Sequence, residues 1–338
     1  MSIERVTITT PSRLAFTLIN LSRGCDRING GAGVALSNPK FKCQVEQSNE
    51  LKLQFSNNLS FPYVEQVNEF VVNLLENINC PPVQIRIIEQ IPPHTGFGSK
   101  TATLLSVGRA IVSLYRKEIS TDKLAKMAHR AGTSGVGVNT FDKGGFIIDG
   151  GHAISVEQQE AADIFLPSRF SRMKTVPPIL FSGKIPWKLT VIVPKGKLIQ
   201  GEAELAHFRN TCPIPINSVY EIAHIVCFRM PSAIIEQDYW AFCRAINELQ
   251  STYWKLSQIN NQTEEVKYII NNARKHGFDA VGISSNGPAL YGLSRDTQRS
   301  NEWLHKLTTD KLVETFWHAI VPSKGAVLRR TIVEGRAK

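Results

Sequence analysis

Residues 91–102 read IPPHTGFGSKTA, a glycine-rich bend between two regular segments. The segment before it, VQIRIIEQI at 83–91, has the β-branched content of a strand, and the one after it repeats apolar residues every three or four positions, as a helix does. Glycines allow a positive φ and a close approach of the backbone to an anion, and a helix start offers unpaired N–H groups. The stretch therefore predicts a strand–loop–helix unit whose glycines either bind an anion or simply turn the chain.

Two further glycine-rich turns favour the anion site. AGTSGVG at 131–137 and SSNGPALYG at 284–292 also lie beside predicted strand or helix ends. In the first bend, serine and threonine would add hydroxyl donors and the lysine a point charge, although the GxxxxGK[ST] spacing of a Walker loop is absent. The candidate anion-binding residues are Gly96, Gly98, Ser99, Lys100, Thr101, Ser134 and Gly135, with His94 beside them.

Strand patterns dominate the early part of the chain and helix patterns the late part, which predicts an α+β protein rather than a strict βαβ alternation. Strands are expected at 6–9, 13–20, 42–47, 51–55, 83–91, 144–149, 189–194 and within 279–293; helices are expected at 62–78, from 99, at 120–129, 217–229, 238–256 and 262–275. A boundary near Pro177-Pro178 would divide the chain into lobes of residues 1–176 and 177–338.

Composition narrows the class of protein. The 338 residues are 42% hydrophobic and 20% charged, and the formal net charge is +10. No arginine-rich tract or RNA-binding signature accompanies that charge, which favours a polyanionic small molecule over nucleic acid. No apolar run approaches the roughly 18 residues of a membrane span, and no signal region is present, so a cytoplasmic protein is expected. The six cysteines form no CxxC pair, so neither a metal site nor a disulfide framework is predicted.

The motifs resemble those of the GHMP superfamily, and most closely the β-ribofuranosylaminobenzene 5′-phosphate synthases of methanopterin biosynthesis. That family carries RLHFTLIDL, RVDGGxGxAL, HxGxGSGTQ and SGxGxxxFExGGFIVDGGH. This chain has RLAFTLINL at 13–21, RINGGAGVAL at 27–36, HTGFGSKTA at 94–102 and SGVGVNTFDKGGFIIDGGH at 134–152. The resemblance covers nearly the whole chain. Related members of the family build C-nucleoside antibiotics.

The resemblance implies a GHMP-kinase-like two-lobed fold and a phosphoribosyl transfer. The ring carbon that bears the carboxylate of an aromatic acid would attack the anomeric carbon of phosphoribosyl pyrophosphate, and pyrophosphate and carbon dioxide would leave. Mg²⁺ is the implied cofactor, and a homodimer is expected from superfamily habit. Positioning and electrostatics would account for most of the barrier reduction.

The main alternative is a GHMP kinase that transfers phosphate from ATP. Many such kinases carry GxxSGxD, and AGTSGVG puts Gly137 at the position of the aspartate, where no proton can be accepted. Homoserine kinases manage without that aspartate, so the alternative stays open. A binding protein without catalytic activity is a third interpretation.

The remaining candidates come from the resemblance and from polar residues in unusual positions. Asp149, His152 and His94 are the catalytic candidates, with structural turn roles as the alternative. The acceptor-binding candidates are Arg13, Glu202, His207 and Arg209, with a salt bridge for the first and a solvated loop for the others as alternatives. The loop at 284–292 resembles the third motif of the GHMP superfamily, and this third-motif loop contributes Ser285, Asn286 and Gly287.

Departures from the family pattern bear on the acceptor. Ala15 replaces a histidine, Asn20 and Asn29 replace aspartates, and Lys100 and Ala102 replace a glycine and a glutamine. If the two asparagines lie near the acceptor, the loss of two acids would ease binding of additional carboxylates. The sequence then predicts that a dicarboxylated heteroaromatic ring is used at least as well as 4-aminobenzoate.

Overall fold

The larger of two sheets is built on a pair of long antiparallel strands, β1 (Ser2–Asn20) and β2 (Arg27–Gln47). The computed structural model describes residues 2–56, 61–159, 161, 164–168, 170–171, 173 and 175–334. The strand order is β12–β1–β2–β4–β3, with β5 and β6 also paired to β2, and β7 to β5. The other strands of this sheet are β3 (Lys52–Phe55), β4 (Val83–Glu89), β5 (Phe146–Asp149), β6 (His152–Ala153), β7 (Ile179–Gly183) and β12 (Val327–Glu334).

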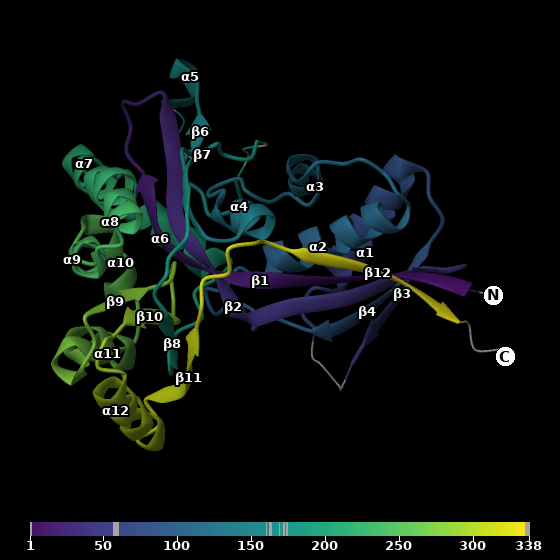
Figure 1. The fold of residues 1–338 in the computed structure, drawn as a ribbon. Coiled ribbons are helices and arrows are strands. Elements are labelled where there is room, and N and C mark those ends of the chain that lie inside the picture. The colour runs from purple at the N-terminus through teal and green to yellow at the C-terminus, as the bar shows by residue number, and fades with distance from the viewer. Residues whose placement is uncertain are drawn as a thin grey trace.

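The smaller sheet has the order β11–β8–β10–β9 and lies among the later helices (Figure 1). Its strands are β8 (Leu189–Pro194), β9 (Ala280–Ile283), β10 (Leu290–Leu293) and β11 (Val313–Ala319). Helices α1 and α2 pack on the larger sheet, and both chain ends lie at the same end of the molecule. The helices are α1 (Val64–Ile78), α2 (Ser99–Leu114), α3 (Thr121–Met127), α4 (Val136–Lys143), α5 (Val156–Gln159), α6 (Glu202–Thr211), α7 (Ile216–Ala223), α8 (Met230–Glu236), α9 (Tyr239–Leu249), α10 (Tyr253–Asn260), α11 (Glu264–Asn272) and α12 (Thr297–Thr309); a π-helical segment (His224–Arg229) joins α7 to α8, and a 3₁₀ turn (Ala273–His276) follows α11.

One continuous apolar core joins the two sheets. Phe16 of β1 stacks on Tyr291 of β10 with ring centroids 4.4 Å apart, and both side chains are fully buried. A second, smaller cluster fills the space between the smaller sheet and α11 and α12. Because β1 also carries Arg13, one of the predicted site residues, this shared core fixes the smaller sheet relative to that residue.

The α+β class is confirmed, while several details differ from the sequence prediction. The first two predicted strands form one strand, which passes through a register shift at Pro11/Ser12. The strands β7 and β12 lie beyond residue 176 yet belong to the larger sheet, so the two sheets do not divide at that residue. The reason is that the chain returns to pair β12 with β1 after completing the smaller sheet.

Helices α4, α5, α6 and α12 escaped the sequence analysis, and the helix predicted at 217–229 continues through α8. Helix α4 is short and rich in glycine, valine, asparagine and threonine, which have low helix propensity. Helices α6 and α12 present too few apolar residues to give a clear period. The predicted helix 238–256 is two helices, because the chain turns at Gln250–Thr252. Within the described part of the chain, no helix has the length and apolar character needed to span a bilayer.

Candidate active site

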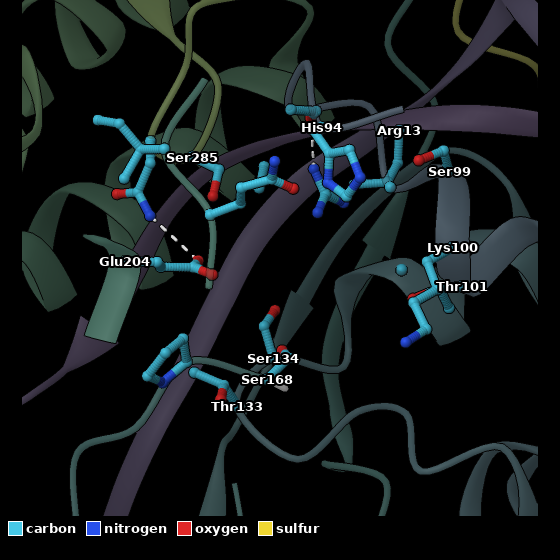
Figure 2. A pocket seen from close by; sticks show the side chains of 18 of the residues that line it. Arg13, His94, Ser99, Lys100, Thr101, Thr133, Ser134, Ser168, Glu204 and Ser285 are labelled. Atoms are coloured by element: carbon cyan, nitrogen blue, oxygen red, sulfur yellow. Dashed lines mark hydrogen bonds between the residues drawn. The ribbon is translucent and has the colours of Figure 1, made fainter. Parts of the chain in front are cut away.

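A cavity of about 450 Å³ lies where the three glycine-rich loops meet (Figure 2). Its lining comes from β1, the 94–98 loop, the first turn of α2, the turn before α4, α6, α10 and the 285–287 loop. Of the residues predicted from the sequence, it is lined by Arg13, His94, Gly96, Gly98, Ser99, Lys100, Thr101, Ser134, Ser285, Asn286 and Gly287. Elements distant in the sequence therefore converge on one site.

Backbone and side-chain hydrogen bonds tie the loops together. Arg13 Nη1 and Ser284 Oγ both donate to the Gly96 carbonyl oxygen, at 2.6 and 2.9 Å. The N–H of Ala15 donates to Ser284 Oγ (3.1 Å), and the N–H of Ser285 donates to the Ala15 carbonyl oxygen (2.9 Å). The mid-strand arginine thus has a backbone partner in the 94–98 loop, rather than the salt bridge considered from the sequence.

Glycine is required at two positions of the 94–98 loop. Gly96 has φ +94°, and a Cβ there would lie 2.9 Å from the Ser284 carbonyl oxygen. Gly98 has φ +74°, and a Cβ there would lie 2.9 Å from Arg13 Cγ. Both backbone conformations are ones that residues with side chains rarely adopt. The glycines therefore permit close packing of the loop as well as its turn.

The first turn of α2 faces the cavity. Gly98 is the N-cap and forms no side-chain capping hydrogen bond. Ser99, Lys100 and Thr101 follow it and line the cavity, and Ser99 Oγ lies 2.7 Å from the Tyr63 hydroxyl oxygen. The first N–H groups of a helix have no intrahelical acceptor and carry the positive end of the helix dipole. An anion would be stabilised at this end of the cavity.

Arg130 is a cavity residue that the sequence analysis missed. Its Nε donates to Thr101 Oγ1 at 3.0 Å. Burial lowers the pKa of Arg130, and burial together with Arg130 lowers that of Arg13 to about 10, while Glu204 acts in the opposite direction on both. The described lining thus contains three cationic side chains, those of Arg13, Lys100 and Arg130, and one carboxylate, that of Glu204. The one sequence signal for Arg130 is that it directly precedes the glycine-rich turn AGTSGVG.

Asp149 is buried beneath the cavity and does not line it. Its Oδ2 accepts the N–H of Gly135 (2.9 Å) and the Ser134 hydroxyl (3.2 Å), and its Oδ1 accepts the N–H of Gly151 (3.1 Å). Burial raises the pKa of Asp149 to about 7, against the effect of these hydrogen bonds. The geometry assigns Asp149 to holding the start of α4, so that Ser134 faces the cavity, whereas Gly135 does not line it.

The two histidines proposed as catalytic residues have different positions. His152 is 2% exposed, and its Nδ1 lies 3.2 Å from Thr175 Oγ1, outside the cavity lining. Burial lowers its pKa. His94 is exposed at the cavity mouth with φ +61°, and its ring meets Tyr63 edge-on at a centroid distance of 6.0 Å. Of the three catalytic candidates, only His94 borders the cavity.

Helix α6 presents Glu204, rather than the predicted residues, to the cavity. Glu202 and Arg209 are exposed, and His207 is buried against Trp254, with ring centroids 5.2 Å apart. Because residues four apart share a helix face, Glu204 and Phe208 line the cavity together. Recognition of the helix in the sequence would have separated these two faces.

The expectation of a dicarboxylated acceptor loses its structural basis. Asn20 is engaged in its own turn, donating to the Arg27 carbonyl oxygen at 2.8 Å and accepting from the Ser22 N–H at 3.0 Å. Neither Asn20 nor Asn29 is among the cavity residues. The argument that their replacement of aspartates favours a dicarboxylated acceptor therefore fails, since it required both near the acceptor.

The described residues hold no group of three or more histidine, cysteine, aspartate or glutamate side chains that could bind a metal ion. Glu204 is the lone carboxylate in the described lining of the cavity. Magnesium prefers oxygen ligands and is commonly held by one or two carboxylates plus substrate phosphates. The described chain therefore offers no magnesium cage of its own.

Lys255 of α10 is fully buried, and burial lowers its pKa from 10.5 to about 7. Between those pH values Lys255 is protonated in the unfolded chain and neutral in the folded protein. The contribution of Lys255 to the unfolding free energy therefore rises with pH. We expect Lys255→Met to remove that rise between about pH 7 and 10. Urea denaturation of both proteins across this range measures it, and parallel pH profiles would contradict it.

Comparisons with known proteins agree with this geometry. The family model for the GHMP kinases N terminal domain matches residues 63–146, and that for GHMP kinases C terminal matches 230–312. A beta-ribofuranosylphenol 5'-phosphate synthase of Methanocaldococcus jannaschii is 35% identical over 84% of this chain and 88% of its own length. The protein of the same name from Archaeoglobus fulgidus is 32% identical, over 84% and 86% respectively. The chain belongs to the β-ribofuranosylphenol 5′-phosphate synthase family.

This synthase-family chain is an enzyme of the transferase class with the GHMP fold, as the sequence resemblance indicated. The solved structure of a homoserine kinase from Cytophaga hutchinsonii superposes with a TM-score of 0.66, covering 96% of this chain and 97% of the kinase. Their sequences are 16% identical, so the likeness shows the fold alone. The two-lobed GHMP architecture is thereby confirmed.

Proposed function

We propose that the enzyme transfers a phosphoribosyl group from phosphoribosyl pyrophosphate to the carboxylate-bearing carbon of an aromatic or heteroaromatic acid. The observation that carries the proposal is the cationic cavity at the start of α2, which Arg13, Lys100 and Arg130 line beside the positive end of the helix dipole. A donor with several phosphates suits such a site. Family membership supports ribosyl transfer, because the relatives are named for a ribofuranosyl 5′-phosphate product.

The cavity residues then have different roles in the displacement of pyrophosphate by the ring carbon. The arginines and the first turn of α2 hold the phosphates and stabilise the charge that develops as the bond from the anomeric carbon to pyrophosphate breaks. The ring carbon forms its new bond to the anomeric carbon, and the carboxylate leaves as carbon dioxide while its bonding electrons restore the aromatic ring. Positioning of the two reactants supplies much of the remaining acceleration. Mg²⁺ enters as a chelate of the donor's pyrophosphate and so belongs to the substrate.

The acceptor class follows from the family and from the aromatic part of the cavity. The relatives are named for a phenol product, and the sequence resemblance points to an aminobenzene product. These two products differ in one ring substituent. Phe208 and Trp254 border the cavity beside Glu204, and these almost fully buried rings make this end of the cavity apolar. Three kinds of acceptor fit an apolar site beside a carboxylate. They are 4-hydroxybenzoate, 4-aminobenzoate and a heteroaromatic carboxylate used to build C-nucleosides.

Calorimetry separates this proposal from a kinase. Gly137 lines the cavity, and its position lacks the carboxylate that many GHMP kinases use to accept the substrate proton. We expect phosphoribosyl pyrophosphate to bind with Mg²⁺ present and ATP to bind far more weakly. Tight ATP binding with production of ADP from a small alcohol would overturn the proposal.

Lys100 provides a first test of the donor site. A charge-assisted contact contributes roughly 1.5–3 kcal/mol, so Lys100→Ala should weaken donor binding by about 10-fold to 150-fold. The affinity for the acceptor should change far less, because the side chain lines the α2 side of the cavity. Titration of each substrate separately gives the two affinities. A donor affinity equal to that of the wild type would remove Lys100 from the phosphate site.

A further inference from the structure

A chain of hydrogen bonds runs from the protein interior to the cavity. Lys255 Nζ donates to Gln258 Oε1 and to the Ile283 carbonyl oxygen, both at 2.8 Å. Gln258 Nε2 donates to Asn286 Oδ1 at 3.1 Å, and Asn286 Nδ2 donates to Glu204 Oε1 at 3.1 Å. The chain links α10, the third-motif loop and α6, which are distant in the sequence.

The buried lysine sets the direction of every link. An ammonium group can only donate, and even a neutral amine has two N–H bonds for its two acceptors here. Gln258 must therefore present its oxygen to Lys255 and its amide nitrogen to Asn286. Asn286 in turn accepts with its oxygen and donates with its nitrogen, so Glu204 receives an N–H rather than a second oxygen. Burial raises the pKa of Glu204, while the amide N–H of Asn286 and the charges of Arg130 and Arg13 favour the ionised carboxylate, which can accept a further hydrogen bond from a ligand.

The surroundings of Glu204 suit a flat ring with a polar substituent. Phe208 lies one turn along the same helix, and Trp254 packs against it with ring centroids 5.2 Å apart. Trp254 Nε1 is buried and has no hydrogen-bond partner among the described residues. Figure 2 shows Glu204 on the opposite side of the cavity from Lys100 and Thr101, and its carboxylate interacts electrostatically with Arg13 and Arg130, which lie between the two ends.

We infer that Glu204 selects the acceptor by accepting a hydrogen bond from a hydroxyl or amino substituent on its ring, and that Lys255, Gln258 and Asn286 are positioning residues that keep this carboxylate an acceptor. The inference rests on the proposed function, since it assumes that an aromatic acid occupies this end of the cavity. The hydroxyl groups of the donor's ribose have the same chemistry, and the test must distinguish them.

The first experiment compares two acceptors, one of which has its hydrogen-bond donor replaced by a methyl ether. 4-Hydroxybenzoate and 4-methoxybenzoate are titrated into protein saturated with ribose 5-phosphate and pyrophosphate, which cannot react. We expect the wild type to prefer the hydroxyl compound by about 10-fold or more, and Glu204→Gln to lose most of that preference. The matched control is Glu202→Gln, the same change at an exposed position of the same helix, which should keep it.

Gln258→Glu tests the direction of the chain. A carboxylate at 258 still pairs with Lys255 but cannot donate, so Asn286 must turn its nitrogen toward residue 258 and its oxygen toward Glu204. We expect the KM for the acceptor to rise about 10-fold, with the affinity for phosphoribosyl pyrophosphate within about twofold of the wild type. Thermal unfolding should show the variant at least as stable as the wild type. A purely structural role of the hydrogen-bond chain predicts the same stability, so this measurement only shows that the variant folds. Only the positioning role predicts the loss confined to the acceptor.

Three outcomes would overturn the inference in different ways. Unchanged preference in Glu204→Gln would show that the carboxylate does not contact the acceptor. Loss of donor affinity in that variant, with the acceptor preference intact, would assign Glu204 to the ribose hydroxyl groups. A wild type that binds neither phosphoribosyl pyrophosphate nor any aryl carboxylate would overturn the proposed function as well.

Discussion

Gly96→Ala is expected to reduce activity by about 100-fold or more while the protein still folds. The new Cβ would lie 2.9 Å from the Ser284 carbonyl oxygen, at a residue with φ +94°. The contact must push the 284–287 loop away from the 94–98 loop, which disturbs Arg13 and the start of α2 together. Backbone strain and overpacking should lower the unfolding free energy by about 1–3 kcal/mol. Steady-state turnover and urea denaturation measure the two effects.

Gly24→Ala is the matched control for that prediction. Gly24 also has a left-handed backbone, with φ +82°, but a Cβ there meets nothing within 4 Å. It should cost about 1 kcal/mol of stability through backbone strain and leave turnover unchanged. Equal losses of turnover in the two variants would mean that the contact with Ser284 does not organise the site.

Arg130→Ala should weaken binding of the donor by about 30-fold to several thousand-fold. Removal of a partner from a buried, hydrogen-bonded charge pair typically costs about 2–5 kcal/mol. Arg130 is also held against the start of α2 by its bond to Thr101, so its loss removes a charge at a fixed position. Calorimetric titration with phosphoribosyl pyrophosphate gives the affinity.

Two variants make the result for Arg130 specific. Arg130→Lys should recover part of the affinity, since a lysine restores the charge but not the planar two-pronged contact with phosphate. Arg209→Ala removes an arginine that is exposed on α6 and lies outside the cavity lining, so donor affinity should stay at the wild-type level. If Arg130→Ala binds the donor like the wild type, the phosphates lie elsewhere.

Local patterns in the sequence were enough to find the strand–loop–helix unit around Gly96 and Gly98. The chemistry of that unit is contained in about a dozen consecutive residues, and its N-terminal helix turn lines the cavity as expected. The N-cap of α3 was likewise predicted, and Ser120 Oγ accepts the N–H of Lys123 at 3.2 Å. Such features depend on neighbours in sequence, which a single chain displays.

The residues that the sequence analysis misassigned depend on contacts between distant segments. Asp149 lies in a segment typical of the family, but only the paired strands show that it points under α4 and away from the cavity. Glu204 and Glu202 are two residues apart, and only the direction of α6 decides which one enters the site. Arg130 enters it because α3 ends beside α2, a tertiary contact that leaves no periodic signal.

The most direct measurement is incubation of the enzyme with phosphoribosyl pyrophosphate, Mg²⁺ and a panel of aryl carboxylates. The account predicts that carbon dioxide and pyrophosphate appear in equal amounts, together with a C-riboside that retains its 5′-phosphate. The Arg130→Ala protein should lose both products in parallel. Pyrophosphate release without decarboxylation, or turnover only with ATP and an alcohol, would contradict the proposed ribosyl transfer.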